Sequence, residues 1–269
     1  MNRLLLNPLK KTRIVRVGDV EIGGNNLPVV QSMTNTVTAD VSATLKQINA
    51  ASDVGARIMR VAVPDKEAAA ALPEILNHSP VPIVADIHFD YRLALASITA
   101  GVHKLRINPG NIGSRDRVRE VVNAALDAGI PIRVGVNAGS LEKDLLKKHG
   151  HPTSEALAES ALRNAGILEE LGFTDIVLSL KGSDVPMTVE AYRIVSKQAD
   201  YPLHVGITEA GTRWTGAIRS AVGLGVLLAI GLGDTLRVSL AADPVDEVIA
   251  AYRILESLGI EKTRPTVIV

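Results

Sequence analysis

The 269-residue sequence contains no cysteine. The chain therefore forms no disulfide, no thiolate zinc site and no cysteine nucleophile, and its own residues offer no cysteine ligands to an iron–sulfur cluster. The sequence also lacks an excess of either charge, because 29 Lys and Arg residues balance 29 Asp and Glu residues. A balanced chain has no general basic field to attract nucleic acid or an anionic membrane, so any anion site must be local.

Long apolar runs are missing as well. No run reaches the roughly 18 residues that a membrane-spanning helix needs. The N-terminal sequence MNRLLLNPLKK has an apolar stretch that is too short for a signal peptide. We therefore expect a cytoplasmic protein that has neither a membrane nor a nucleic acid as a partner. The hydrophobic content of 46% is ample for a buried core.

What the sequence does contain is a regular series of short runs rich in Val and Ile, separated by segments of helical period. Many of these segments end in Gly, as helix C-termini often do. The runs begin at Val29, Ile58, Ile83, Lys104, Ile132, Asp175, Leu203 and Thr235. Such alternation fits a closed barrel or an open doubly wound sheet. Eight even units, and no Gly-x-Gly-x-x-Gly after the first strand, favour a (β/α)8 barrel, which typically takes about 250 residues.

A hairpin is predicted before the barrel. In TRIVRVGDVEIGG the apolar residues alternate on both sides of Gly18-Asp19, a residue pair that closes two-residue turns. We predict an α/β fold in which a short β-hairpin over about residues 12–24 precedes a TIM barrel over about residues 28–260. Residues 1–269 would then form a single substrate-binding domain.

One connection, after the fifth barrel strand, is longer and more charged than the others. It contains SLEKDLLKKHGH, which ends just before Pro152. The segment leaves the C-terminal end of a strand, where such barrels place their chemistry, so a mobile lid or a partner contact is one interpretation. A solvated helical insertion explains a charge-rich segment equally well.

Four arginines lie within apolar strand contexts and should point into one enclosed space. They are Arg60, Arg106, Arg133 and Arg237. Like charges repel there, so the group needs acidic side chains or a polyanion, and the arginine fork matches phosphate oxygens. Asp86 and Glu209 can offset two of the four charges, whereas Lys181 adds a fifth cation. The surplus predicts a site for a diphosphate, although any single arginine could instead be a salt-bridged core residue.

Three further residues at strand ends are candidates for acid–base chemistry. Asp86 and His88 are two positions apart and therefore share one face of a strand. We interpret His88 as a phosphate or hydroxyl contact and Asp86 as its orienting group or a hydroxyl acceptor, although a lone His is more often a satisfied core residue. Glu209 could act as general acid or base, or as a charge partner for an arginine. The cationic surroundings argue against a divalent metal ion.

Several motifs occur in order along the chain with even spacing. They are VQSMTNT (30–36), RVAVPD (60–65), ADIHFDYRLAL (85–95), LRINPGNIG (105–113), RVGVNAGSLEKDL (133–145), GITEAGT (206–212) and GDTLRVSLAADP (233–244). With these motifs the chain resembles the 4-hydroxy-3-methylbut-2-enyl diphosphate synthases of the non-mevalonate isoprenoid pathway. The resemblance extends from Thr12 to Leu258.

The resemblance implies an oxidoreductase. Members of that family convert 2-C-methyl-D-erythritol 2,4-cyclodiphosphate by a two-electron reductive ring opening, with electrons from flavodoxin or ferredoxin passing through a [4Fe–4S] cluster. The implied diphosphate contacts are Arg60, His88, Arg106, Arg133, Lys181 and Ser239, with Asn108, Asn137, Thr208 and Glu209 nearby. To these the charge argument adds Arg237. We assign Glu209, Asp86 and His88 as catalytic candidates.

The resemblance also implies a part that this chain does not contain. In the family a C-terminal domain supplies three Cys and one Glu to the cluster, its first Cys just past the segment that corresponds to Pro265–Val269. Family members also pair head to tail, so that this domain caps the barrel of a second subunit. We therefore expect a barrel that holds the substrate but is inactive alone.

Two alternatives remain open. The chain could be a non-catalytic substrate-binding or assembly module that acts only with a cluster domain in trans. It could also be another phosphate-handling barrel, such as a pterin-diphosphate condensing synthase, which the ordered motifs disfavour.

Overall fold

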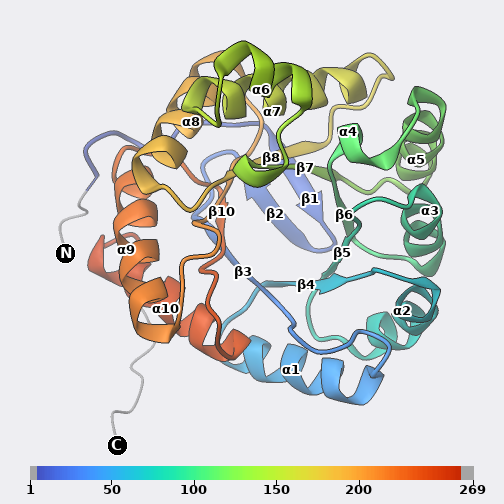
Figure 1. The fold of residues 1–269 in the computed structure, drawn as a ribbon. Coiled ribbons are helices and arrows are strands. Elements are labelled where there is room, and N and C mark those ends of the chain that lie inside the picture. Colours follow the sequence, from blue (N-terminus) through green and yellow to red (C-terminus); the bar gives the residue numbers. More distant parts are fainter. Residues whose placement is uncertain (1–4, 262–269) are drawn as a thin grey trace, which may run out of the picture.

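In a computed structural model, which describes residues 5–261, eight parallel strands form a barrel with helices around it (Figure 1). The hydrogen-bonded order is β8-β7-β6-β5-β4-β3-β10-β9, and a parallel bridge between Leu178 and Leu203 connects β8 to β9. The barrel strands are β3 (Val29–Met33), β4 (Ile58–Ala62), β5 (Ile83–Asp86), β6 (Lys104–Ile107), β7 (Ile132–Asn137), β8 (Ile176–Lys181), β9 (His204–Val205) and β10 (Thr235–Leu236). The predicted TIM-barrel fold is confirmed.

The helices follow the strands as the sequence pattern predicts. They are α1 (Val41–Asp53), α2 (Lys66–His78), α3 (Tyr91–Ala100), α4 (Pro109–Ile112), α5 (Arg115–Ala128), α6 (Lys143–His149), α7 (Ser154–Glu169), α8 (Val185–Gln198), α9 (Arg213–Ala229) and α10 (Pro244–Ser257), with a 3-10 turn, η1 (Ala138–Ser140). Aspartates begin many of them: the Asp65 and Asp184 side chains accept hydrogen bonds from the third backbone N–H that follows. Such caps satisfy N–H groups that the helix leaves free.

The predicted hairpin consists of β1 (Ile14–Val17) and β2 (Val20–Gly23), joined by Gly18-Asp19. Gly18 has a φ of 58°, a conformation that glycine adopts without steric cost. Buried side chains of the hairpin form an apolar cluster with those at the beginning of three barrel strands: Val17, Val20, Ile22, Val29, Ile58 and Val84. The hairpin therefore closes the N-terminal end of the barrel, and Figure 1 shows it across the centre of the ring.

Above this apolar floor the barrel interior becomes polar. The register places Asp86 of β5 beside Arg106 of β6, and Arg106 beside Arg133 of β7. Paired residues on neighbouring strands point to the same side of the sheet. The fold thus gathers charged side chains from several strands toward the C-terminal end of the barrel.

The charged segment after β7 forms a short helix fixed to its neighbour. In α6, Leu145 is buried. Lys148 and His149 both contact Glu159 of α7, at 2.7 and 3.1 Å, and Asp144 pairs with Arg163 at 2.6 Å. These contacts favour the interpretation as a helical insertion over that as a mobile lid.

Candidate functional site

Asp86 lies at the centre of a group of charged side chains, which we call the charged cluster. Its other members are Arg60, Arg106, Arg133, Lys181 and Arg237. The Asp86 carboxylate is 3.2 Å from Nη1 of Arg106, 3.6 Å from Nε of Arg60 and 3.4 Å from Nε2 of His88. The side chain is only 4% exposed. Burial alone would raise the pKa of Asp86, but Arg60, the hydrogen bond with His88, Arg106 and Arg133 together hold it well below its usual range. Asp86 is therefore an anion that orients Arg60 and Arg106, which are predicted to bind phosphate, and the imidazole of His88.

Arg60 and Arg106 are both buried, and one carboxylate is shared between them. Burial, and then the proximity of Arg237 and Arg106, lower the pKa of Arg60 to about 10 in spite of Asp86. Arg106 lies across Gly135 of β7, donating a hydrogen bond to its carbonyl at 3.3 Å. A Cβ at Gly135 would be 2.4 Å from Nε of Arg106. The guanidinium group can therefore occupy its position only because residue 135 is a glycine.

Arg133 and Lys181 are buried basic residues, and no acidic side chain in the described part of the chain forms an ion pair with either of them. Arg133 is 1% exposed, and its Nε and Nη1 have no hydrogen-bond partner among the described residues. Burial, with Arg60 and Arg106 nearby, lowers its pKa, and burial and the same cluster lower the pKa of Lys181. Since arginine stays protonated in proteins, an anion that reached this pair would relieve an electrostatic cost.

Sequence reasoning missed Lys104, which lies two residues before Arg106 on the same face of β6. It is fully buried, and its Nζ has no hydrogen-bond partner within residues 5–261. Burial, Arg133 and Arg60 lower its pKa. His204 of β9 is also fully buried within the field of these cations. The period of two that identified Arg106 would also have identified Lys104 as an inward residue.

The charge balance predicted for the site requires a correction. Arg237 is neutralised by Glu247 of α10, whose two carboxylate oxygens are 2.9 Å from its Nε and 2.8 Å from its Nη2. No ion pair of the described residues includes Glu209, and Glu247 is the second carboxylate that contacts an arginine of the site. Glu247 was missed, although it lies on the buried stripe of α10 with Val248, Ala251, Ile254 and Leu255. A charged residue within such a stripe indicates a buried partner.

His88 and Glu209 lie at the rim rather than inside. The His88 side chain is 54% exposed, and its described contacts are with Asp86 and the neighbouring Phe89 ring. Glu209 is exposed and has a φ of 50°, the one positive φ of a non-glycine residue in the described part of the chain. Strained backbone of this kind is often found at functional sites. Both residues are accessible to a ligand at the mouth.

The remaining predicted ligands have different settings. Asn108 is buried and caps α4, because its Oδ1 accepts a hydrogen bond from Gly110 N at 3.1 Å. Thr208 is half-buried, and its backbone N–H donates to Gly182 O at 3.2 Å. Asn137, at the end of β7, and Ser239, after β10, are half-buried too. The structure gives no contact of the Asn137, Thr208 or Ser239 side chains with the charged cluster.

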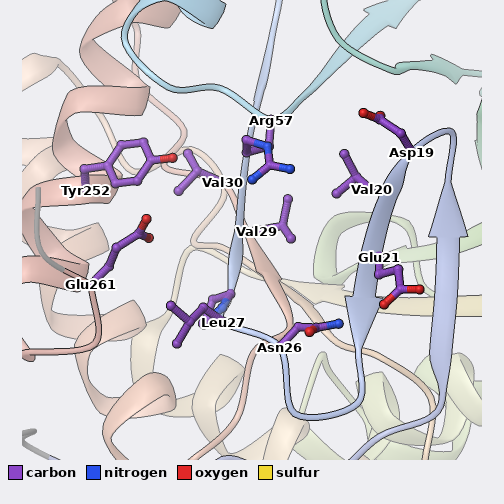
Figure 2. Close-up of a pocket in the computed structure, with 11 residues that line it drawn as sticks. Asp19, Val20, Glu21, Asn26, Leu27, Val29, Val30, Arg57, Tyr252 and Glu261 are labelled. Carbon is purple, nitrogen blue, oxygen red and sulfur yellow. The ribbon is translucent and has the colours of Figure 1, made fainter. Parts of the chain in front are cut away.

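A pocket of about 420 Å³ lies at the other end of the barrel (Figure 2). Asp19 and Glu21 of the hairpin face it from one side, and Tyr252 and Glu261 from the other. Val29 and Val30, at the beginning of β3, form part of its wall. Since chemistry in TIM barrels is found at the C-terminal end of the strands, we assign this pocket no part in the site.

Within residues 5–261, no group of three or more His, Asp or Glu side chains is arranged to hold a metal ion. No helix in that range is both long and apolar enough to cross a membrane.

Residues 12–252 match the family model described as the GcpE TIM-barrel domain. The chain belongs to the GcpE TIM-barrel family. A curated relative from Geobacter sulfurreducens, 4-hydroxy-3-methylbut-2-en-1-yl diphosphate synthase (flavodoxin), is 60% identical over 252 residues, which are 94% of this chain and 71% of the relative. The protein of the same name from Geobacillus thermodenitrificans is 57% identical over 96% of this chain and 69% of its own.

Solved structures similar to this GcpE barrel agree with its fold. Dihydropteroate synthase from Yersinia pestis superimposes with a TM-score of 0.64 at 14% identity, over 91% of this chain and 98% of its own. A 3-dehydroquinate dehydratase from Geobacillus kaustophilus gives 0.63 at 14% identity, over 95% and 99%. At such low identity the likeness concerns the barrel alone.

Proposed function

We propose that this chain is the substrate-binding barrel of a 4-hydroxy-3-methylbut-2-enyl diphosphate synthase. Its charged cluster would hold the diphosphate of 2-C-methyl-D-erythritol 2,4-cyclodiphosphate. The family and the names of the curated relatives support the reaction. The hairpin over about residues 12–24 and the barrel over about residues 28–260 would act as one domain.

The observation that carries the proposal is the uncompensated charge at the end of the barrel. With Arg237 paired to Glu247, Asp86 is left as the carboxylate in contact with Arg60 and Arg106, and among residues 5–261 no ion pair includes Arg133 or Lys181. Buried cations without partners are costly unless a ligand provides the opposite charge. A diphosphate provides two or more negative charges and several acceptor oxygens for arginine forks.

In this proposal the residues of the cluster have distinct roles. Arg60, Arg106, Arg133 and Lys181 bind the phosphoryl oxygens. Asn108, Asn137, Thr208 and Ser239 would hydrogen-bond the ligand near the rim, and Arg237 would act from its pair with Glu247.

The catalytic candidates act at the mouth. Asp86 keeps the His88 ring in place, so that its imidazole can donate a hydrogen bond to a phosphate oxygen. Glu209 would donate a proton to a substrate hydroxyl, which needs that proton to leave as water.

The described residues do not fit an iron–sulfur cluster. The sequence has no cysteine, and residues 5–261 contain no metal-binding group of His, Asp or Glu. We therefore derive no electron transfer on this chain, and we propose that the cluster is held by residues outside it.

The proposed partners follow from the same reaction. Flavodoxin stands in the names of the relatives, and we propose it, or ferredoxin, as the electron donor. A second subunit would pair with this one. In support, α9 exposes an apolar stripe at intervals of four residues, formed by Trp214, Ile218, Val222 and Val226, which are 77, 49, 55 and 43% exposed. A cytoplasmic location remains a prediction from the sequence.

A turnover assay tests the proposal that this chain binds the substrate while residues outside it hold the cluster. The chain is incubated with the cyclic diphosphate and reduced flavodoxin, with and without a cluster-bearing C-terminal domain of a GcpE relative added in trans. We expect no product from the chain alone. Product formed by the chain alone would contradict the proposal that the cluster is supplied from outside it.

A further inference from the structure

The hydroxyl of Tyr192 is inserted into the barrel wall between β8 and β9. Tyr192 lies on α8 and is fully buried. Its Oη accepts a hydrogen bond from Leu180 N at 3.0 Å and donates one to His204 O at 2.6 Å. One phenol thereby bridges a strand N–H and the carbonyl of the adjacent strand.

The neighbouring contacts show what this hydroxyl replaces. Before it along the seam, Leu178 N donates directly to Pro202 O at 2.9 Å, next to the bridge between Leu178 and Leu203. A regular parallel ladder would next join Leu180 N to His204 O. In this barrel the Tyr192 hydroxyl stands between those two groups. The seam between β8 and β9 is therefore widened at one position.

Lys181 follows Leu180 and lies at this widened position. A Cβ on Gly206, just past β9, would be 2.7 Å from the backbone carbonyl oxygen of Arg237, 3.3 Å from Nζ of Lys181 and 3.5 Å from its Cε. The Lys181 ammonium group thus lies beside a glycine, which has no side chain that could displace it. The inserted hydroxyl on one side and Gly206 on the other define where the Lys181 side chain can go.

We propose that Tyr192 is a positioning residue, which sets the strand spacing that directs Lys181 toward the bound diphosphate. The inference rests on the proposed function, because it assigns Tyr192 a part in the same anion site. Phenylalanine at this position would leave Leu180 N and His204 O to pair directly or to remain unsatisfied. Either result changes the path of β8 just before Lys181.

A double-mutant cycle tests this role. The affinity for 2-C-methyl-D-erythritol 2,4-cyclodiphosphate is measured by calorimetry for the wild type, Tyr192→Phe, Lys181→Met and the double variant. Tyr192→Phe should weaken binding about fivefold, the scale of one lost hydrogen bond. If Tyr192 acts through Lys181, the double variant should bind within about twofold of Lys181→Met alone. Independent effects that multiply in the double variant would overturn the proposal.

Tyr252→Phe is the matched control, because it removes a tyrosine hydroxyl that donates to Gly55 O at 2.8 Å on the far side of the barrel. Its affinity should equal that of the wild type. If Tyr192→Phe does not fold, Tyr192→His replaces it in the cycle, with the same coupling to Lys181→Met expected and the same multiplicative outcome overturning the proposal. A folded wild type that fails to bind would instead refute the diphosphate site itself.

Discussion

Glu247 holds Arg237 through both of its carboxylate oxygens, and the same carboxylate accepts hydrogen bonds from Ser32 Oγ at 2.7 Å and Leu240 N at 3.0 Å. Glu247 is only 2% exposed. It thus joins β3, the end of β10 and the beginning of α10. The pair removes one arginine from the free charge of the site and fixes the wall beside it.

Glu247→Gln should destabilise the fold by about 3–5 kcal/mol, because it leaves a largely buried guanidinium without its counter-charge. Urea unfolding followed by circular dichroism measures this. Glu190→Gln, which breaks the exposed pair with Arg193, is the control and should cost about 0–1 kcal/mol. Equal effects of the two substitutions would show that the buried pair is not important for stability.

Gly135→Ala should weaken binding of the cyclic diphosphate about tenfold or more, because the new Cβ would occupy the place of the Arg106 guanidinium. Calorimetric titration measures the affinity. Gly166→Ala is the control, since a Cβ at Gly166 meets nothing within 4 Å. If Gly135→Ala binds as tightly as the control, Arg106 does not contact the ligand from its present position.

The pH dependence of stability should report on His204. Burial, with Arg133, Lys181, Lys104 and Arg60 nearby, lowers its pKa well below the ordinary value. Below about pH 6.5 the unfolded chain binds a proton that the folded chain does not, so this residue makes stability fall as the pH is lowered from about 7 to 5.

His204→Gln should make that slope shallower by up to about 1.4 kcal/mol per pH unit. Denaturant unfolding at pH 7, 6 and 5 measures the slopes. His78→Gln, at the exposed end of α2, serves as the control for the substitution of a histidine by glutamine. Identical slopes for the wild type and His204→Gln would contradict a neutral, buried His204.

Much of the barrel could be predicted because a local apolar run marks where most of the strands begin. Six strands begin where their apolar runs begin, at Val29, Ile58, Ile83, Lys104, Ile132 and Thr235. The other two, β8 and β9, begin one residue later than predicted. The two shortest strands, β9 and β10, owe their place to the closure of the ring, and no local pattern encodes the inserted hydroxyl of Tyr192.

The residues of the site could be predicted where the alternation of inward and outward side chains along a strand was enough. They could not be predicted where the contacting residue lies on a distant element. Asp86, Arg106 and Arg133 lie side by side because inward residues of neighbouring strands meet. The Arg237–Glu247 pair joins the chain just after β10 to a helix that packs outside the barrel; the helical period of α10 indicates that Glu247 is buried, but not which residue it contacts. Lys104 could have been found, since it shares its face of β6 with Arg106.

Isothermal titration of the folded chain with 2-C-methyl-D-erythritol 2,4-cyclodiphosphate at low salt tests the diphosphate site most directly. We expect one ligand per chain, and Arg106→Met should weaken its binding about tenfold or more, the scale of a lost charge-assisted contact. Arg115→Met, which removes a surface arginine paired with Glu170, should leave the affinity unchanged. No heat of binding, or equal affinities for the two variants, would contradict the assignment of the charged cluster as the substrate site.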